Sequence, residues 1–213
     1  MIRFDHAYQT LAIGVAALAG FVDAIGFVET AGFFVSFMTG NSTRFAVGVA
    51  EGTRGAAIAG GLIATFVAGV VAGSLVAEQY RSVRTPAVLS CATLLLCAAA
   101  GLRAVDAVWP AVLCLTLAMG VVNAAFRGRD GAVVGVTYMT GTLVQTGYKL
   151  ANRLRGEGDA RWWPHLALWA GLTGGAILGA VAVIQWGVLA YGAAIGLAAA
   201  LTLRAAAIDR QAR

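Results

Sequence analysis

The most informative feature of this chain is a short motif that occurs twice. VSFMTG at residues 35–40 recurs as VTYMTG at residues 136–141. A second matched pair precedes these motifs, GFVDA at residues 20–24 and GVVNA at residues 120–124. Because two landmarks recur in the same order and at almost the same separation, the sequence predicts a tandem duplication. We expect repeat one to cover about residues 8–104 and repeat two about residues 105–207.

The composition indicates an integral membrane protein. Of 213 residues, 60% are hydrophobic and only 12% are charged, and the mean hydropathy is +0.81. A soluble domain of this size could not cover so much apolar surface with polar groups. We therefore predict an all-α polytopic protein that forms a single membrane domain over residues 1–213. The net charge of +5 comes from arginines between apolar stretches, so we assign it to anionic lipid and predict no nucleic-acid partner.

Six stretches have the length and apolar character of membrane-spanning helices, which need about 20 residues. They are residues 11–28, 55–77, 86–102, 107–126, 165–186 and 188–203. The first stretch also resembles a signal peptide, because Arg3 precedes it. Its landmark recurs in mid-chain, however, where a signal peptide does not belong, and we therefore predict a retained span.

Two further segments, residues 31–50 and 131–150, contain the Met-Thr-Gly motifs and are interrupted near their middle by glycine and polar residues. Non-helical backbone at membrane depth is tolerated only where protein or water surrounds it. We therefore predict two half-helices that meet at Thr-Gly in each segment, forming either a re-entrant hairpin or a broken span. Six spans with re-entrant segments give inverted repeats, which we favour, whereas eight crossings give parallel repeats. Basic residues place both termini in the cytoplasm in either arrangement.

Each repeat also contains a GxxxG pattern. Gly69 and Gly73 form one pair, and Gly175 and Gly179 form the other. Small residues at this spacing let helix backbones approach each other closely within a membrane. We predict that both patterns serve helix packing.

Two positions carry a charge in the first repeat and a neutral polar group in the second. Asp23, inside the first span, corresponds to Asn123, and Arg44, after the first motif, corresponds to Gln145. Charged groups inside a membrane are costly, so these positions are candidate functional sites. Asp23 either couples a proton or cation or makes a structural bond to a nearby donor. Arg44 either binds an anion near the helix break or neutralises Asp23.

The motif residues complete the candidate solute-binding site. Glycine permits a break in the helix, and hydroxyl and amide side chains can cap the helix that follows or face a solute. These residues are Thr39, Gly40, Asn41 and Ser42 in the first repeat and Thr140, Gly141 and Thr142 in the second. The sequence contains no pattern typical of a metal site, a catalytic nucleophile with its base, or a phosphate-binding loop. We therefore expect no metal, no cofactor and no enzymatic activity.

GFVDAIGF at residues 20–27, followed by FVSFMTGNSTR at residues 34–44, resembles the YoaK-like family of small bacterial inner-membrane proteins. This family is catalogued as domain of unknown function 1275. The resemblance extends over essentially the whole chain in length and span pattern. It implies a multi-pass protein of the bacterial plasma membrane with six spans, and it supplies no substrate or activity.

The residues themselves favour a small-solute transporter or channel, with a polar site between two repeats at the broken-helix motifs. The alternative is a non-transporting membrane protein that acts in assembly or regulation and uses the polar residues only to hold its helices together. The expected partners are the lipid bilayer and a small solute or ion. The sequence is compatible with a homo-oligomer and does not fix the oligomeric state.

Overall fold

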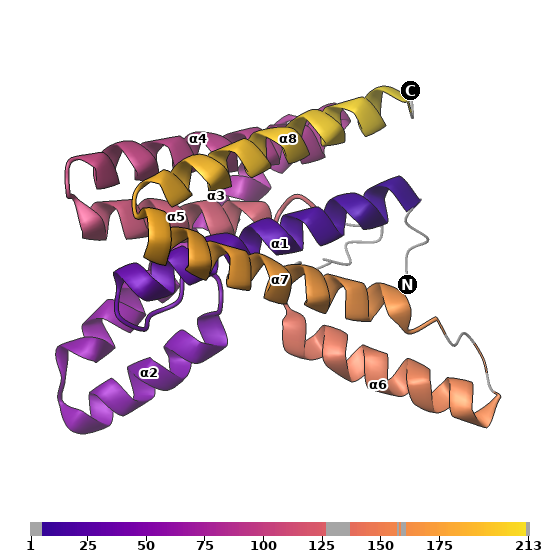
Figure 1. Cartoon of the computed structure of the whole chain (residues 1–213), viewed down its shortest axis with the longest axis horizontal. Coiled ribbons are helices and arrows are strands. Elements are labelled where there is room, and N and C mark those ends of the chain that lie inside the picture. Colours follow the sequence, from indigo (N-terminus) through magenta and orange to yellow (C-terminus); the bar gives the residue numbers. More distant parts are fainter. Residues whose placement is uncertain (1–5, 127–136, 157, 159–160, 212–213) are drawn as a thin grey trace.

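The described part of the chain is a bundle of α-helices (Figure 1). The computed structural model describes residues 6–126, 137–156, 158 and 161–211. These residues form eight α-helices and one short 3-10 helix, with no β-strand among them. The helices are α1 (His6–Glu29), α2 (Met38–Glu51), α3 (Arg54–Gln79), η1 (Arg81–Val83), α4 (Arg84–Ala104), α5 (Val108–Val122), α6 (Met139–Arg155), α7 (Trp163–Trp186) and α8 (Leu189–Gln211). The all-α prediction is confirmed.

Five of the helices are long and apolar enough to cross a membrane, namely α1, α3, α4, α7 and α8. They match five of the six predicted spans. The remaining predicted span, residues 107–126, is longer than its helix, because α5 ends at Val122 after 15 residues, or about 22 Å. Asn123 marks this end, where its side-chain Nδ2 donates a hydrogen bond to the carbonyl oxygen of Met119 at 2.9 Å. The chain turns immediately afterwards.

Helices α1 and α5 form the centre of the bundle. α1 packs along α7 and against α8, whereas α5 packs along α3 and α4. Leu11, Val15 and Leu18 of α1 are completely buried, as are Leu115 of α5 and its neighbour Met119. The first predicted span is therefore part of the core.

Glycines allow the backbones to touch at two helix crossings, α1 with α7 and α3 with α5. A Cβ atom at Gly175 of α7 would lie 2.0 Å from the carbonyl oxygen of Ala17 in α1. A Cβ atom at Gly69 of α3 would lie 2.4 Å from the carbonyl oxygen of Leu117 in α5. Both distances are far below van der Waals contact, so a larger residue does not fit. The prediction that the GxxxG patterns serve helix packing is confirmed.

Polar contacts tie the two ends of the chain together. The hydroxyl of Tyr8 in α1 donates a hydrogen bond to Asp209 of α8 at 2.5 Å. Arg204 of α8 donates to the hydroxyl of Thr10 at 2.8 Å. The described chain therefore begins and finishes at the same end of the bundle (Figure 1).

Helices α2 and α6 extend away from the bundle in opposite directions (Figure 1). α2 begins near the middle of the molecule and runs to the lower left, whereas α6 begins beneath α7 and runs to the lower right, towards the end that carries the termini. α2 packs on α3, and α6 packs on α7. Each short helix ends at a glycine with left-handed backbone, Gly52 (φ 63°) and Gly156 (φ 70°).

Candidate functional site

Both Met-Thr-Gly motifs begin a helix with the same local geometry. Phe37 before α2 has φ −85° and ψ 75°, and Tyr138 before α6 has φ −85° and ψ 67°. The N–H of Met38 bonds to a carbonyl two residues earlier at 3.1 Å, and the N–H of Met139 does so at 3.0 Å. The two motifs thus adopt one conformation.

The prediction of two half-helices that meet at Thr-Gly is wrong for the first segment. Residues 31–37 are not helical, and Thr39 and Gly40 lie in the first turn of α2. The cause lies partly in the preceding residues, whose backbone N–H groups bond to side chains of α1 and α2 instead of forming a helical turn. In the second segment, residues 131–136 lie outside the described residues, and α6 again begins just before Thr140 and Gly141.

The predicted capping role of the motif side chains is also wrong. Neither α2 nor α6 has a side-chain hydrogen bond at its N-cap. The hydroxyls of Ser42 and Thr142 instead donate to backbone carbonyls within their own helices, at 2.9 Å and 2.7 Å. A capping residue must stand just before the first residue of the helix. Each helix begins at the methionine, so the polar residues that follow the methionine lie inside the helix.

The glycine of each motif makes room for an aromatic ring. A Cβ atom at Gly40 would lie 2.6 Å from the ring of Phe37, and a Cβ atom at Gly141 would lie 2.1 Å from the ring of Tyr138. In both motifs the ring that precedes the helix folds back over its first turn. The pattern aromatic-Met-Thr-Gly therefore describes a packing unit.

Asp23 holds the segment that precedes α2. Its Oδ1 atom accepts hydrogen bonds from the backbone N–H of Val35 at 2.8 Å and of Ser36 at 2.7 Å. Val35 and Ser36 are both buried. A carboxylate bonded to backbone donors in this way fixes the path of the chain, and such charge-assisted bonds are among the stronger ones in proteins. Of the two roles considered for Asp23, the structure shows the bond to nearby donors.

Asn123 makes the related contact in the second half. Its Oδ1 atom accepts a hydrogen bond from the hydroxyl of Thr137 at 3.1 Å. Thr137 is the counterpart of Ser36 in the repeated motif. Both polar residues therefore connect an apolar helix to the segment that leads into the next motif helix.

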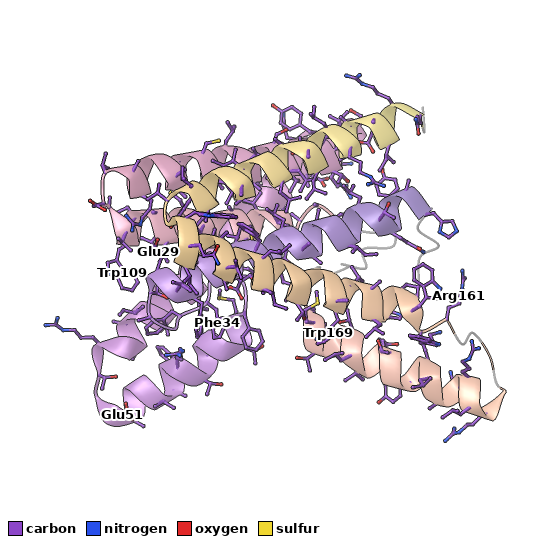
Figure 2. All side chains as sticks on the ribbon, in the orientation of Figure 1. Glu29, Phe34, Glu51, Trp109, Arg161 and Trp169 are labelled. Carbon is purple, nitrogen blue, oxygen red and sulfur yellow. The ribbon has the colours of Figure 1, made fainter. Side chains whose placement is uncertain are left out.

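Asn41 pins the same segment from the other side. Its Nδ2 atom donates to the carbonyl oxygen of Phe34 at 2.7 Å, and its Oδ1 atom accepts from the N–H of Phe34 at 3.0 Å. Asn41 is completely buried. Figure 2 shows Phe34 beside the start of α2, where these bonds are made. Asn41 is thus occupied by the backbone and does not face a solute.

Arg44 does not pair with Asp23. Its Cζ atom lies 5.0 Å from the centroid of the Phe33 ring, and its side chain also approaches Gly32. The proposed neutralisation of Asp23 by Arg44 is therefore wrong, because the carboxylate already has backbone donors. Ion pairs join Arg81 to Glu78, and Arg103 to both Glu29 and Asp106.

Five candidate residues are exposed. They are Thr39, Ser42, Arg44, Thr140 and Gln145. The structure thus divides the predicted site into buried or half-buried residues that hold the chain, Asp23, Asn41 and Asn123, and exposed polar residues in the first two turns of α2 and α6. Within the described ranges, no cluster of three or more His, Cys, Asp or Glu side chains is arranged to hold a metal ion.

Sequence reasoning missed a charged cluster at the end of the bundle opposite the termini. Arg103 of α4 donates from Nε to Glu29 of α1 at 2.9 Å and from a terminal nitrogen to Asp106 at 2.8 Å. The Glu29 side chain is 9% exposed and the Asp106 side chain 92%. Figure 2 shows Glu29 at this end. The sequence contained a signal for this pair. Glu29 and Arg103 each follow directly after a predicted span, and the six-span arrangement places both of these span ends at the same membrane face.

The two carboxylates should contribute very differently to stability. Arg103→Gln is expected to lower the free energy of unfolding by about 2 kcal/mol, because it leaves the Glu29 carboxylate buried without its cation. Asp106→Asn removes only an exposed pair and should cost less than about 0.5 kcal/mol. Thermal unfolding of the purified protein in detergent measures both. Equal losses in the two variants would contradict the assignment of the buried pair as the stabilising one.

Comparison with known proteins identifies the family. The protein family described as "Protein of unknown function (DUF1275)" matches residues 11–206. The chain belongs to this family. It is also similar to UPF0700 transmembrane protein RA0705 of Rhizobium meliloti (strain 1021), with 38% identity over 205 residues, which are 93% of this chain and 85% of the relative. The family suggested by the sequence is therefore confirmed. No solved structure matches the chain.

Membership of the DUF1275 family, together with five helices of spanning length, makes this chain a membrane protein. The family description gives no activity. The geometry of the motif helices is therefore the guide to function.

Proposed function

We propose that this DUF1275 protein is a small-solute transporter or channel of the bacterial inner membrane. The observation that carries the proposal is the matched pair α2 and α6. In an apolar chain, two short helices begin at the same motif, are held by related bonds to Asp23 and Asn123, and expose polar side chains on their first turns. The proposal includes no enzymatic step.

A two-fold relation between the halves supports the proposed repeats. If α1–α4 correspond to α5–α8, the packing of α1 on α7 corresponds to that of α5 on α3, and the packing of α1 on α8 to that of α5 on α4. The pairs α2 with α3 and α6 with α7 also correspond. We take repeat one as about residues 8–104 and repeat two as about residues 105–207. The first helix of each repeat therefore packs on the third helix of the other.

The directions of the helices favour six crossings and inverted repeats. α1 and α5 run in opposite directions along the bundle, and so do α2 and α6 (Figure 1). In this arrangement α1, α3, α4, α5, α7 and α8 cross, while α2 and α6 return to the face from which their segments entered. Inverted repeats that meet at discontinuous segments are a known transporter architecture. We place the end with the termini in the cytoplasm, because most of the basic residues lie there under the positive-inside rule.

The exposed polar side chains argue for a wet pathway. Thr39 and Arg44 on α2 and Thr140 and Gln145 on α6 are exposed in the first two turns of their helices. Polar groups at membrane depth are costly in lipid and are found where they line water or protein. In this proposal Asp23, Asn123 and Asn41 are positioning residues, and the exposed polar side chains of α2 and α6 face the solute.

Solute flux in proteoliposomes tests the proposal. Swelling is followed by light scattering with urea and glycerol as neutral probes and with potassium nitrate plus valinomycin as the anionic probe. Wild-type protein is expected to accelerate the swelling for at least one probe over protein-free liposomes. Arg44→Gln, which makes the first repeat resemble the second, should reduce nitrate entry about tenfold. Arg54→Gln, an exposed arginine at the start of α3, is the matched control and should leave nitrate entry unchanged.

Two results would contradict the proposal. If no probe enters faster than in protein-free liposomes, the non-transporting alternative, an assembly or regulatory membrane protein, is favoured. If nitrate entry is equal in wild type, Arg44→Gln and Arg54→Gln, Arg44 does not face the solute.

A further inference from the structure

The exposed side chain of Arg44 has a fixed place on the segment that precedes α2. Its Cζ atom lies over the ring of Phe33, 5.0 Å from the ring centroid. A Cβ atom at Gly32 would lie 2.7 Å from a terminal nitrogen of Arg44. Gly32 also has φ 122°, a conformation that suits glycine and that other residues rarely adopt. An aromatic face and a backbone without a side chain therefore hold the guanidinium group.

The ring of Phe33 is itself held by two helices. The N–H of Phe33 donates a hydrogen bond to the hydroxyl of Thr30 at 2.9 Å. This buried hydroxyl donates to the carbonyl oxygen of Gly26 in α1 at 2.7 Å. A Cβ atom at Gly55 of α3 would lie 3.9 Å from the ring. The end of α1 and the start of α3 thus position the ring that contacts Arg44.

The carboxylates of the described residues do not neutralise Arg44. Five of them already bond to backbone N–H groups, to other arginines or to a tyrosine, namely Asp23, Glu29, Glu78, Asp106 and Asp209. The sixth, Glu51, lies seven residues after Arg44 on α2, or about 10 Å along the helix axis, and forms no ion pair with it. Within the described ranges, Arg44 is therefore a cation without a carboxylate partner.

The chemistry of the guanidinium group selects the kind of ligand. It has five N–H donors in a rigid planar fork, which matches two oxygens bonded to one central atom. An aromatic ring attracts the positive charge and leaves these donors able to bond to oxygen. A cation exposed at membrane depth is costly unless water or an anion accompanies it. The position is therefore suited to an oxyanion.

We propose that Arg44, held by Phe33 and Gly32, binds a small oxyanion that offers two oxygens from one centre, such as a carboxylate or nitrate. This inference rests on the proposed transport function and names its solute class. Phe33 and Gly32 are positioning residues. α6 carries the neutral Gln145 at the matching position, so the proposed site belongs to α2. The phosphate of a lipid headgroup offers the same chemistry, and the experiment separates the two sources.

Arginine modification tests the site independently of flux. The protein, purified in a neutral detergent, is treated with phenylglyoxal at one ionic strength in potassium chloride, potassium nitrate or potassium acetate. Mass spectrometry of the digested protein gives the modification rate of each arginine. The rate at Arg44 is expected to fall about fivefold when nitrate or acetate replaces chloride, because the bidentate anion occupies the N–H donors. Arg210, exposed at the end of α8, is the internal control and should react equally in all three salts.

Variants of the two contacting residues separate recognition from stability. Phe33→Leu keeps an apolar side chain without a ring and should weaken the protection of Arg44 by nitrate about threefold. Phe33→Tyr retains the ring and should retain the protection. Arg44→Lys keeps the charge without the planar fork and should reduce nitrate entry into proteoliposomes about tenfold, as Arg44→Gln does. Melting temperatures close to that of the wild type show that these variants fold.

The outcomes distinguish this inference from the transport proposal. Equal modification of Arg44 in all three salts would overturn the oxyanion site and leave transport of urea or glycerol standing. Protection by added phosphatidylglycerol, without protection by nitrate or acetate, would assign Arg44 to a lipid headgroup and overturn the solute. Full nitrate entry in Arg44→Lys would overturn recognition through the planar fork. Protection by nitrate in a protein that conducts none of the probes would overturn transport and leave the binding site.

Discussion

Asp23→Ala is expected to lower the free energy of unfolding by about 2 to 6 kcal/mol, because two buried backbone N–H groups lose the carboxylate that accepts their hydrogen bonds. The lost bonds hold residues 31–37, which in turn place the first turn of α2. Asp23→Asn keeps an oxygen at the same position and should cost about 1 kcal/mol. Thermal unfolding in detergent and hydrogen exchange at Val35 and Ser36 measure the two effects. In Asp23→Ala the exchange of these amides should approach that of exposed backbone.

Asn123→Ala is the matched control for this prediction. Its Oδ1 atom accepts one bond, from the hydroxyl of Thr137, and a neutral hydrogen bond of this kind contributes about 1 kcal/mol. The fold should therefore be more sensitive to loss of the Asp23 side chain than to loss of the Asn123 side chain. A proton-coupling role for Asp23 makes a different prediction, namely that Asp23→Asn keeps full stability and loses flux. Loss of flux without loss of stability would contradict the positioning role assigned here.

The structure explains why the role of Asp23 could not be assigned from the sequence. Periodicity shows that Asp23 lies within an apolar helix, and the cost of charge in a membrane makes it conspicuous. Its partners, however, are main-chain groups of Val35 and Ser36, and main-chain donors leave no mark in a sequence. The same holds for Asn41, whose partner is the backbone of Phe34. Both residues were predicted to bind a solute because the sequence does not reveal that their partners are backbone groups.

Helix positions were more predictable than helix breaks. Spans follow from long apolar runs, and five of the six predicted spans have matching helices of spanning length. The expected break at Thr39-Gly40 relied on glycine as a helix breaker. In the structure Gly40 is helical and serves to admit the ring of Phe37. The glycine and polar residues of the motif indicate an irregular local structure. The role of Gly40 becomes clear only from the packing of the Phe37 ring against it.

The crossing of α1 and α7 should be the point of the fold most sensitive to added volume. A Cβ atom at Gly175 would lie 2.0 Å from the carbonyl oxygen of Ala17, and a Cβ atom at Gly20 would lie 2.0 Å from the carbonyl oxygen of Leu172. The two glycines thus face opposite backbones at one crossing. Backbone atoms cannot rotate aside as side-chain ends can, so the helices must separate and lose contact over the crossing.

Gly175→Ala is expected to lower the free energy of unfolding by about 3 kcal/mol or more, which places it among severe overpacking substitutions. Gly174→Ala is a close control, because it lies on the same helix and a Cβ atom there meets nothing within 4 Å. Its higher helix propensity should make it neutral or stabilising by up to about 1 kcal/mol. The readouts are the yield of monodisperse protein on gel filtration and the melting temperature. Equal melting temperatures for Gly175→Ala and Gly174→Ala would show that the backbones of α1 and α7 are not in contact. That result would contradict the helix packing described here.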